Sequence, residues 1–579
     1  MSLAFPAAAV PAGNVLRAST SIHNTPNSDE SDHSRQSSID ETQDTPSESQ
    51  EAERDLLYLN ILNEAVKEPT RSTRRNAEEA LTPRNCLWTR LPQLDDVDNE
   101  YLLKKGVFEL PAQPYLDAFI EAFFTHVHPF APVVSRADFI RAYQSGDCSL
   151  LLLRTILTAA SVHAPLGVLA ACGFASRAAA QESFFTKAKL LHDFAVEGDI
   201  QMLQSSIILC MIILDHPTEW DFGYWLHNAI RIATRLDLRT ACIRENKSRK
   251  VLKVYRRIWW TLFSLDVFHV FVNTRRTRLL EDTPGIKPIK PRSEDDYEAE
   301  DVPLDSSGLL PAITPQQKLM PVLLCGLCRI AGQCLSALIN KPQQDPRQIM
   351  HSIDGWRKSL PSILHLDDNA GHDLYYIHLQ ALSYRYECIL CRLIRRQRNR
   401  PEEWKEWAKQ RLRAATLELD TMAMRVLASG TLQDFPISLL TPASITTITA
   451  LLALHIESAL DPAETDLVRS MSRISISQTM LVLTQGKEIP VLTRALPIFE
   501  EILAKKNLYL VGQGPTQQIQ TPMQMQEDDV EGGDVEQQGD VLNQFGQEGT
   551  EQMYFDADFL GFDFLDEWSI GQMGFGDQY

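Results

Sequence analysis

The feature that most constrains this chain is a helical pattern of apolar residues, which runs through residues 101–510 with no sustained strand-like alternation. Phe119, Phe123 and Val127 show the spacing, in which apolar side chains recur every three to four residues and so share one face of a helix. Ser135 stands where a helix N-cap is expected. The pattern predicts an all-α fold.

Composition divides the chain into three regions. Residues 1–84 are predicted to be disordered with one short helix, because 18–54 is rich in Ser, Thr, Asp and Glu and has few hydrophobic side chains to bury. Residues 85–506 hold the helical body, which an acidic, Pro-containing loop at 281–311 interrupts. A loop of that length in a compact domain is either mobile or functional. Residues 507–579 form a second segment that we expect to be disordered.

Charge is concentrated at one end of the chain. The net charge is −20, yet no Lys or Arg follows Lys506, and the residues after it include 15 carboxylates. Residues 1–506 therefore carry only −5. No strongly basic region stands out, which argues against a body that binds nucleic acid through bulk charge.

One uncharged stretch, 435–456, is long enough to be weighed as a membrane span. It contains Pro436, Pro442 and a Thr-rich centre, which favour a buried helix beginning near Pro442.

Two CxxC pairs, Cys325/Cys328 (with Cys334 nearby) and Cys388/Cys391, permit a four-thiolate zinc site in principle. Both pairs lie in apolar helical runs, where small thiols pack as core residues. We therefore predict no metal and no cofactor.

Residues 220–276 are the most informative stretch. Their first part predicts an amphipathic helix in which Trp225, Ala229 and Ile232 share one face and Arg231 lies on another. This pattern indicates a helix that packs on a core through its Trp face.

The second part of this stretch, 258–272, is apolar on nearly all sides and encloses Asp266. Such a helix is expected at the centre of a core, and a buried carboxylate needs a partner. The candidates are Arg231, Arg256 and Arg257.

These motifs resemble the fungal-specific transcription factor domain, also called the middle homology region. That family shows a helix of the form WxxxGxAxRxAxxLGLH, a basic run, and RRxWWxLFxxD. The matching positions here are Trp225, Ile230 to Ala233 (with Arg231), Leu236, Leu238, Arg256, Arg257, Trp259, Trp260, Leu262, Phe263 and Asp266. The segment 123–139 also resembles the family's opening, so the resemblance covers roughly 110–460. It implies a large, all-helical regulatory domain.

The chain departs from the family pattern in two ways. Some motif positions differ locally: Ala229 replaces a Gly, Asp237 a Gly, Arg239 a His, and 273–275 a Gly-Arg-Pro. Family members also usually begin with a binuclear zinc cluster of six cysteines, whereas this sequence has only Cys86 before residue 148. We therefore expect no zinc cluster in it. Contact with a promoter would come through a DNA-binding partner, a homodimer, or a segment outside this sequence.

The end of the chain, 553–570, alternates aromatic and acidic residues. Mutual repulsion of the carboxylates keeps the rings solvated and available to a groove on another protein, which is typical of an acidic activation segment. A merely solubilising tail is the alternative, although solubility requires no large hydrophobes. The candidate contact residues are Phe555, Phe559, Leu560, Phe562, Phe564, Leu565 and Trp568.

No nucleophile elbow, phosphate-binding loop or HExxH motif is present, so we predict no catalytic residues and no enzyme activity. Instead we predict a nuclear transcriptional regulator, most simply an activator of fungal metabolic or secondary-metabolite genes. Its tail would recruit transcription machinery, and the resemblance implies that its body would hold the activator silent or respond to a small-molecule effector. The alternative is an interaction protein that modulates related zinc-cluster factors. Basic clusters at 71–75 and 392–400 are candidate nuclear-import signals, although the second also suits a helix C-terminus.

Overall fold

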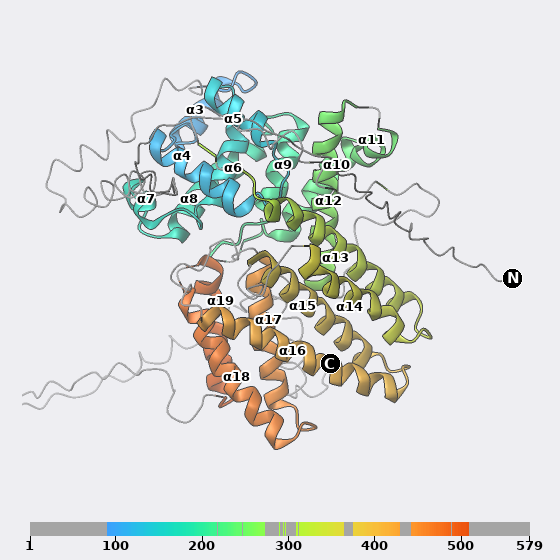
Figure 1. Cartoon of the computed structure of the whole chain (residues 1–579). Coiled ribbons are helices and arrows are strands. Elements are labelled where there is room, and N and C mark those ends of the chain that lie inside the picture. The colour runs from blue at the N-terminus through green and yellow to red at the C-terminus, as the bar shows by residue number, and fades with distance from the viewer. Residues whose placement is uncertain are drawn as a thin grey trace, which may run out of the picture. The chain divides into compact units, whose positions relative to one another are not determined.

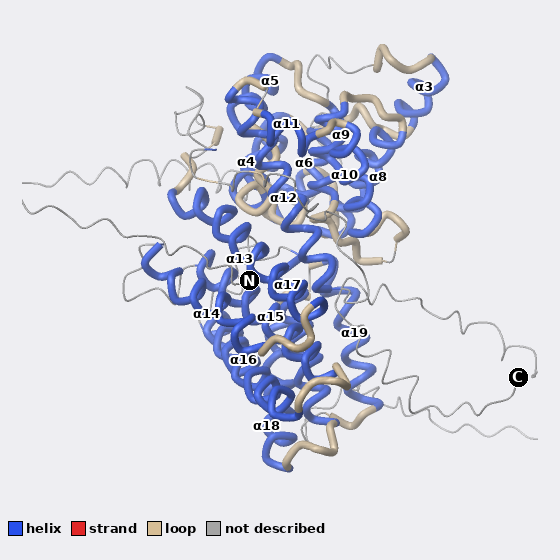
Figure 2. Tube along the Cα trace, turned by 90° about the vertical axis from the view of Figure 1, so that its right-hand side faces the viewer, coloured by secondary structure: helices blue, strands red, loops and turns tan. Residues whose placement is uncertain are grey.

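Helices form all the regular structure in the part of the chain that the computed structural model describes, and no strand occurs there, which confirms the all-α prediction (Figures 1 and 2). The described residues are 90–508 except 217, 246, 364–373, 429–441, 488 and most of 273–311, where only 289, 293, 296, 309 and 310 are described. The predicted short N-terminal helix, the acidic tail and the basic cluster at 71–75 lie outside these residues. All the described residues belong to one unit, 62–579.

Most of the described helices are joined by short connections, and the longest interval between two of them is 273–314, between α12 and α13. They are α3 (Asp96–Lys104), α4 (Gln113–Ala122), the π-helical turn η1 (Phe123–Val127), α5 (Arg136–Ser145), α6 (Leu150–Ala160), α7 (Leu166–Ala171), α8 (Arg177–Asp193), α9 (Asp199–Leu209), α10 (Phe222–Arg235), α11 (Leu238–Arg244), α12 (Arg249–Val272), α13 (Pro315–Asn340), α14 (Pro346–Ile363), α15 (Leu374–Arg396), α16 (Glu402–Ala428), α17 (Pro442–Leu460), α18 (Asp466–Gln485) and α19 (Pro490–Lys505).

Helix α12 explains the arrangement, because it contributes to two cores at once. Ile258 and Leu262 pack into a core formed mainly by α4 to α10. Phe263 and Val267, on other sides of the same helix, pack into a second core with α13 to α16. A helix that is covered on opposite sides must be apolar nearly all round, as the sequence of 258–272 is.

A third core joins the last three helices. Leu452 and Ile456 of α17, Ile476 of α18 and Phe499 of α19 pack together, and Leu508 closes this core at the end of the described chain. Helix α17 also supplies Leu451 to the second core. The C-terminal helices are therefore continuous with the body through α17.

Local signals place several helix ends correctly. Helix α5 begins directly after Ser135, whose hydroxyl accepts a hydrogen bond from the Asp138 backbone N–H. It ends at Gly146, whose φ of 83° is a left-handed conformation that glycine adopts without a steric penalty. Helix α17 begins at Pro442, and its Thr449 is buried. The described part of 435–456 is therefore a packed helix, as predicted.

Among the described helices, α13 is long and apolar enough to cross a membrane by length and composition alone. Half of its most apolar stretch is buried in the protein, and Leu327 and Leu338 are fully buried in the second core. Burial of this kind is expected of the central helix of a helical domain.

The acidic loop at 281–311 lies mostly outside the described residues, but two of its positions pack on the body. Ile289 is buried in the second core. Asp296 is 2% exposed and binds α12 through Arg256. Part of this loop is therefore anchored.

Candidate functional site

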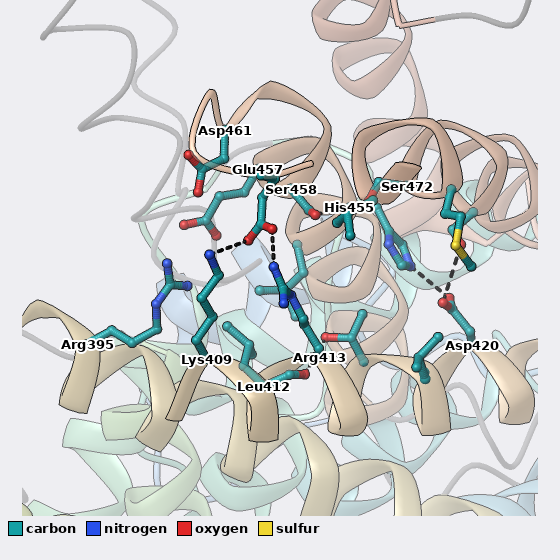
Figure 3. Close-up of a pocket in the computed structure, with 17 residues that line it drawn as sticks. Arg395, Lys409, Leu412, Arg413, Asp420, His455, Glu457, Ser458, Asp461 and Ser472 are labelled. Carbon is teal, nitrogen blue, oxygen red and sulfur yellow. Dashed lines mark hydrogen bonds and ion pairs between the residues drawn. The ribbon is translucent and has the colours of Figure 1, made fainter. Parts of the chain in front are cut away.

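A cavity of about 190 Å³ lies between α16, α17 and α18, beside the end of α15 (Figure 3). Helices α17 and α18 form an antiparallel pair that packs on α16, and the cavity opens where their side chains do not fill the space between them. Its lining residues are Arg395, Lys409, Leu412, Arg413, Thr416, Leu417, Asp420, Leu454, His455, Glu457, Ser458, Asp461, Glu464, Val468, Met471, Ser472 and Ser475.

Most of the cavity wall is apolar. Leu412 and Leu454 lie inside it, while Leu417 and Met471, which are 57% and 52% exposed, mark its rim. Val468 completes this surface from α18. Apolar side chains at an open rim indicate a concave surface where binding would be favourable, because it would remove these side chains from water.

One end of the cavity is an ion-pair cluster. The Glu464 carboxylate, only 8% exposed, binds Lys409 Nζ at 3.2 Å and also Arg413. Figure 3 shows Lys409 and Arg413 extending from α16 to these ion pairs, which are drawn as dashed lines. Glu457 is bound by Arg392 of α15. Arg395, one turn further along α15, has no ion pair or hydrogen bond with any described residue.

The other end of the cavity is a group of hydrogen-bonded side chains around the Asp420 carboxylate. His455 Nε2 lies 2.7 Å from Asp420 Oδ1, and the Ser475 hydroxyl donates to Asp420 Oδ2 at 3.3 Å. Ser472 and Ser458 bond to each other at 3.0 Å. The Asp420 carboxylate is thus satisfied on both oxygens.

The arrangement is suited to binding. The cavity joins an apolar wall to two polar ends, which is how small-molecule sites fix orientation while gaining affinity from burial. Among the described residues, no group of three or more His, Cys, Asp or Glu side chains is placed to hold a metal ion. Sequence reasoning missed this site because its residues come from four helices and form no motif.

The family-motif residues lie elsewhere, in and between the first two cores. Trp225 of α10 is 1% exposed and packs edge-on against His192, with ring centroids 5.0 Å apart. Ala229 and Ile232 are buried beside it, as the predicted face requires. Arg231 is exposed and donates to the Asn228 side chain at 2.7 Å.

The Trp-Trp part of the motif serves packing as well. Trp260 is buried in the second core, and Trp259 is partly buried beneath the Arg239 guanidinium, which lies 6.0 Å from its ring. Arg257 is 1% exposed. Arg256 binds Asp296 through Nε at 2.9 Å and Nη2 at 2.7 Å.

Asp266 is fully buried, as predicted, and two of the three candidates for its partner pair with other residues. Arg231 binds Asn228, and Arg256 binds Asp296. The sequence could not reveal this, because Asp296 reaches α12 from a loop 40 residues away.

The cysteines of both CxxC pairs are buried where α13, α14 and α15 pack together. Cys328 Sγ lies 3.8 Å from the Tyr386 hydroxyl, and Cys334 donates to the Ile349 carbonyl at 3.2 Å. Burial raises the pKa of Cys388 to about 12, so this thiol stays protonated at neutral pH. These contacts are those of core residues.

The basic cluster at 392–400 is partly structural. Arg400 is buried and donates to the carbonyls of Leu338, in the last turn of α13, and of Gln344, which follows that helix. Arg395 and Arg396 occupy the last turn of α15, where cations are favoured. The candidate activation residues, Phe555 to Trp568, lie outside the described residues.

Comparison with known proteins gives a consistent picture. The profile described as "Fungal specific transcription factor domain" matches residues 120–365. A fusaric acid cluster transcription factor of Gibberella fujikuroi is 42% identical over 98% of this chain and 86% of its own length. The protein of the same name in Fusarium oxysporum f. sp. lycopersici is 41% identical over the same shares.

More distant relatives match over less of the chain. Cutinase transcription factor 1 beta of Fusarium vanettenii is 29% identical over 37% of this chain and 25% of its own length. No solved structure matches.

Proposed function

The chain belongs to the fungal specific transcription factor family and is a transcriptional regulator, and on that basis we propose that it activates a cluster of secondary-metabolite genes from within the nucleus. One observation carries this proposal: the relative that is 42% identical across 98% of the chain is named a fusaric acid cluster transcription factor. Similarity over almost the whole chain means that the flanking segments are shared together with the helical domain.

The acidic tail is the proposed activating part. Residues 507–579 contain 15 carboxylates and no Lys or Arg, and their aromatic residues are concentrated at 554–568. Carboxylates on either side of a ring oppose collapse of the chain, so the ring is free to enter an apolar groove of a coactivator.

The helical body, 85–506, is the proposed regulatory part. Most of its motif residues are buried in cores, Trp225, Trp260 and Asp266 among them, and its described surface offers a cavity of small-molecule size. Both features suit a domain that controls the tail. Promoter contact is assigned to a DNA-binding partner, a second copy or a segment beyond this sequence.

Deleting the gene tests the proposal as a whole. Transcripts of the biosynthetic genes that neighbour it should fall, and reintroducing the full chain should restore them. A rise in these transcripts would instead identify a protein that dampens related factors, and unchanged transcripts would refute control of the cluster.

The tail is tested separately by fusing residues 507–579 to a foreign DNA-binding domain. We expect reporter expression that is largely lost when Phe555, Phe559, Phe562 and Trp568 are replaced by Ala. Replacing Gln517, Gln518 and Gln520 by Ala is the matched control and should leave expression unchanged. Equal expression from all three fusions would show that the rings do not recruit the transcription machinery.

A further inference from the structure

We propose that an exposed apolar stripe on α18 binds the acidic, aromatic segment 553–570 of the same chain. The stripe consists of Leu467, Met471, Ile474 and Leu481, each between 49% and 70% exposed. Their successive spacings of four, three and seven residues place them on one face of the helix. More exposed large hydrophobic side chains lie on α18 than on any other described helix.

The stripe is not needed to hold α18 in place, because other faces of the helix already pack on the protein. The buried residues of α18 are Ser472, Ile476, Thr479, Val482 and Leu483. Leu417 of α16 and Met471 lie together at the rim of the cavity, so the exposed apolar surface extends from α18 to α16. Exposed apolar surfaces of this kind mark interaction sites.

The segment 553–570 can reach the stripe. The described chain ends at Leu508, which packs in the third core with Ile476 and Leu483 of α18. About 45 residues separate Leu508 from the segment, and a flexible chain of that length spans roughly 35–40 Å. The stripe itself is about 21 Å long, at 1.5 Å for each helical residue. All of it therefore lies within reach of the segment.

The segment also matches the stripe in length and in spacing. Its large hydrophobic side chains are concentrated in the fifteen residues 554–568, which would be about 22 Å long as a helix. Phe555, Phe559 and Phe562 follow at intervals of four and three residues, as the first three members of the stripe do. Two helices whose apolar residues repeat in this way can pack side by side.

Charge favours this segment over a second copy of the chain as the occupant. The segment contains five carboxylates and no Lys or Arg, whereas the charged residues of α18 are Asp466, Arg469 and Arg473, a net charge of +1. Arg469 binds Asp466, and Arg473 has no ion pair among the described residues. The exposed Glu418 of α16 lies away from the cavity, near Tyr384 of α15. A second copy would bring one positive helix against another, whereas the segment brings negative charge to Arg473.

A tethered segment stays bound without high affinity. The linker gives it an effective concentration on the order of 1 mM at the stripe. A dissociation constant of about 100 µM would then leave about ten bound segments for each free one. While it is bound, its aromatic side chains are covered, so a coactivator can bind only the free form. This regulatory role rests on the proposed function, whereas the contact itself does not.

Chymotrypsin digestion of the full-length chain measures the contact, because this protease cuts after the aromatic residues that the stripe would cover. Cleavage within 554–568, identified by mass spectrometry, should be about tenfold faster in Met471→Glu/Ile474→Glu than in the wild type. Val97→Glu/Leu103→Glu, the same double change at exposed apolar residues of α3, is the control and should leave the rate unchanged. Circular dichroism confirms that each variant is folded. Equal rates in all three chains would overturn the proposal.

A charge reversal and a change of protein concentration identify the occupant. Arg473→Glu should also speed cleavage within 554–568, whereas Arg398→Glu, at an exposed position outside α18, should not. The wild-type rate should be the same at low and at high micromolar concentration, because the contact forms within one chain. Protection that grows with concentration would show that the stripe binds a second copy, which would refute the assignment.

The two proposals fail in different assays. If the tail does not activate transcription, the fusion of 507–579 to a foreign DNA-binding domain gives no reporter signal, while the difference in cleavage persists. If the stripe does not bind the segment, all the chains are cleaved at the same rate, while the fusion still activates the reporter.

Discussion

Replacing Asp296 by alanine is expected to destabilise the helical body by about 3–5 kcal/mol, the range for removing one partner of a buried ion pair. Asp296 is 1% exposed at its side chain, and its partner Arg256 is 12% exposed. Both Arg256 hydrogen bonds end on Asp296 Oδ1, while Oδ2 accepts from the Ser293 backbone N–H at 3.1 Å.

The size of the loss in stability follows from the Arg256 charge that the substitution leaves without a close partner. After Asp296→Ala, the carboxylate that remains near Arg256 among the described residues is Glu245, which is 3.9 Å away and 57% exposed, so it compensates weakly. The guanidinium would stay mostly buried without a close counter-charge. The double variant Arg256→Met/Asp296→Leu removes both charges and should recover most of the lost stability.

Urea denaturation followed by circular dichroism measures the loss, with Glu501→Ala as the control. Glu501 pairs with Lys505 on the surface of α19, and the change should alter stability by no more than about 0.5 kcal/mol. Limited proteolysis should also cut 281–311 faster in Asp296→Ala. A single variant as stable as the wild type, or a double variant less stable than the single one, would refute the reasoning.

Three further outcomes are expected. Desolvation lowers the pKa of His192 and of His378 to about 4, so both side chains stay neutral in the folded protein. The free energy of unfolding should therefore be constant above about pH 6.5 and fall as the pH drops from there toward 4. At pH 5 the loss should be roughly 2 kcal/mol for each histidine. His378→Leu should flatten this dependence in urea titrations at pH 7.5 and 5, and an unchanged slope would contradict it. Trp225→Ala removes a fully buried ring and should cost about 3–5 kcal/mol by urea denaturation, whereas Trp225→Phe should cost less. Arg154, fully buried, donates to the carbonyls of Val107 and Glu109, so Arg154→Ala should lower the melting temperature far more than Arg141→Ala at the surface.

The parts of the fold that periodicity determines were predictable. The apolar character of 258–272 on all sides identified a central helix, and α12 is that helix. Pro442 marked the start of α17, and Ser135 marked the start of α5. These features depend on residues within one or two turns of each other, which is the range over which sequence spacing is informative.

Long-range pairings were not predictable. Asp296 reaches Arg256 across 40 residues, and the three residues Lys409, Arg413 and Glu464 meet only because α16 and α18 pack side by side. The π-helical turn η1, in which the His128 N–H bonds to the Phe123 carbonyl, was also missed. Its aromatic sequence reads as an ordinary helix, since only tertiary packing selects the wider turn.

The position of the cavity along the chain bears on how members of this family could differ. The family profile matches 120–365, which includes the Trp225 and Trp260 motifs and the first two cores as far as α14. The cavity is built from residues 395–475, beyond that match. Because Trp225, Trp260 and most other motif residues are buried in packing, substitutions there cost stability. At the rim of the cavity, Leu417 and Met471 are more than half exposed and less constrained by packing, so substitutions there can change what the cavity accommodates while the fold is kept.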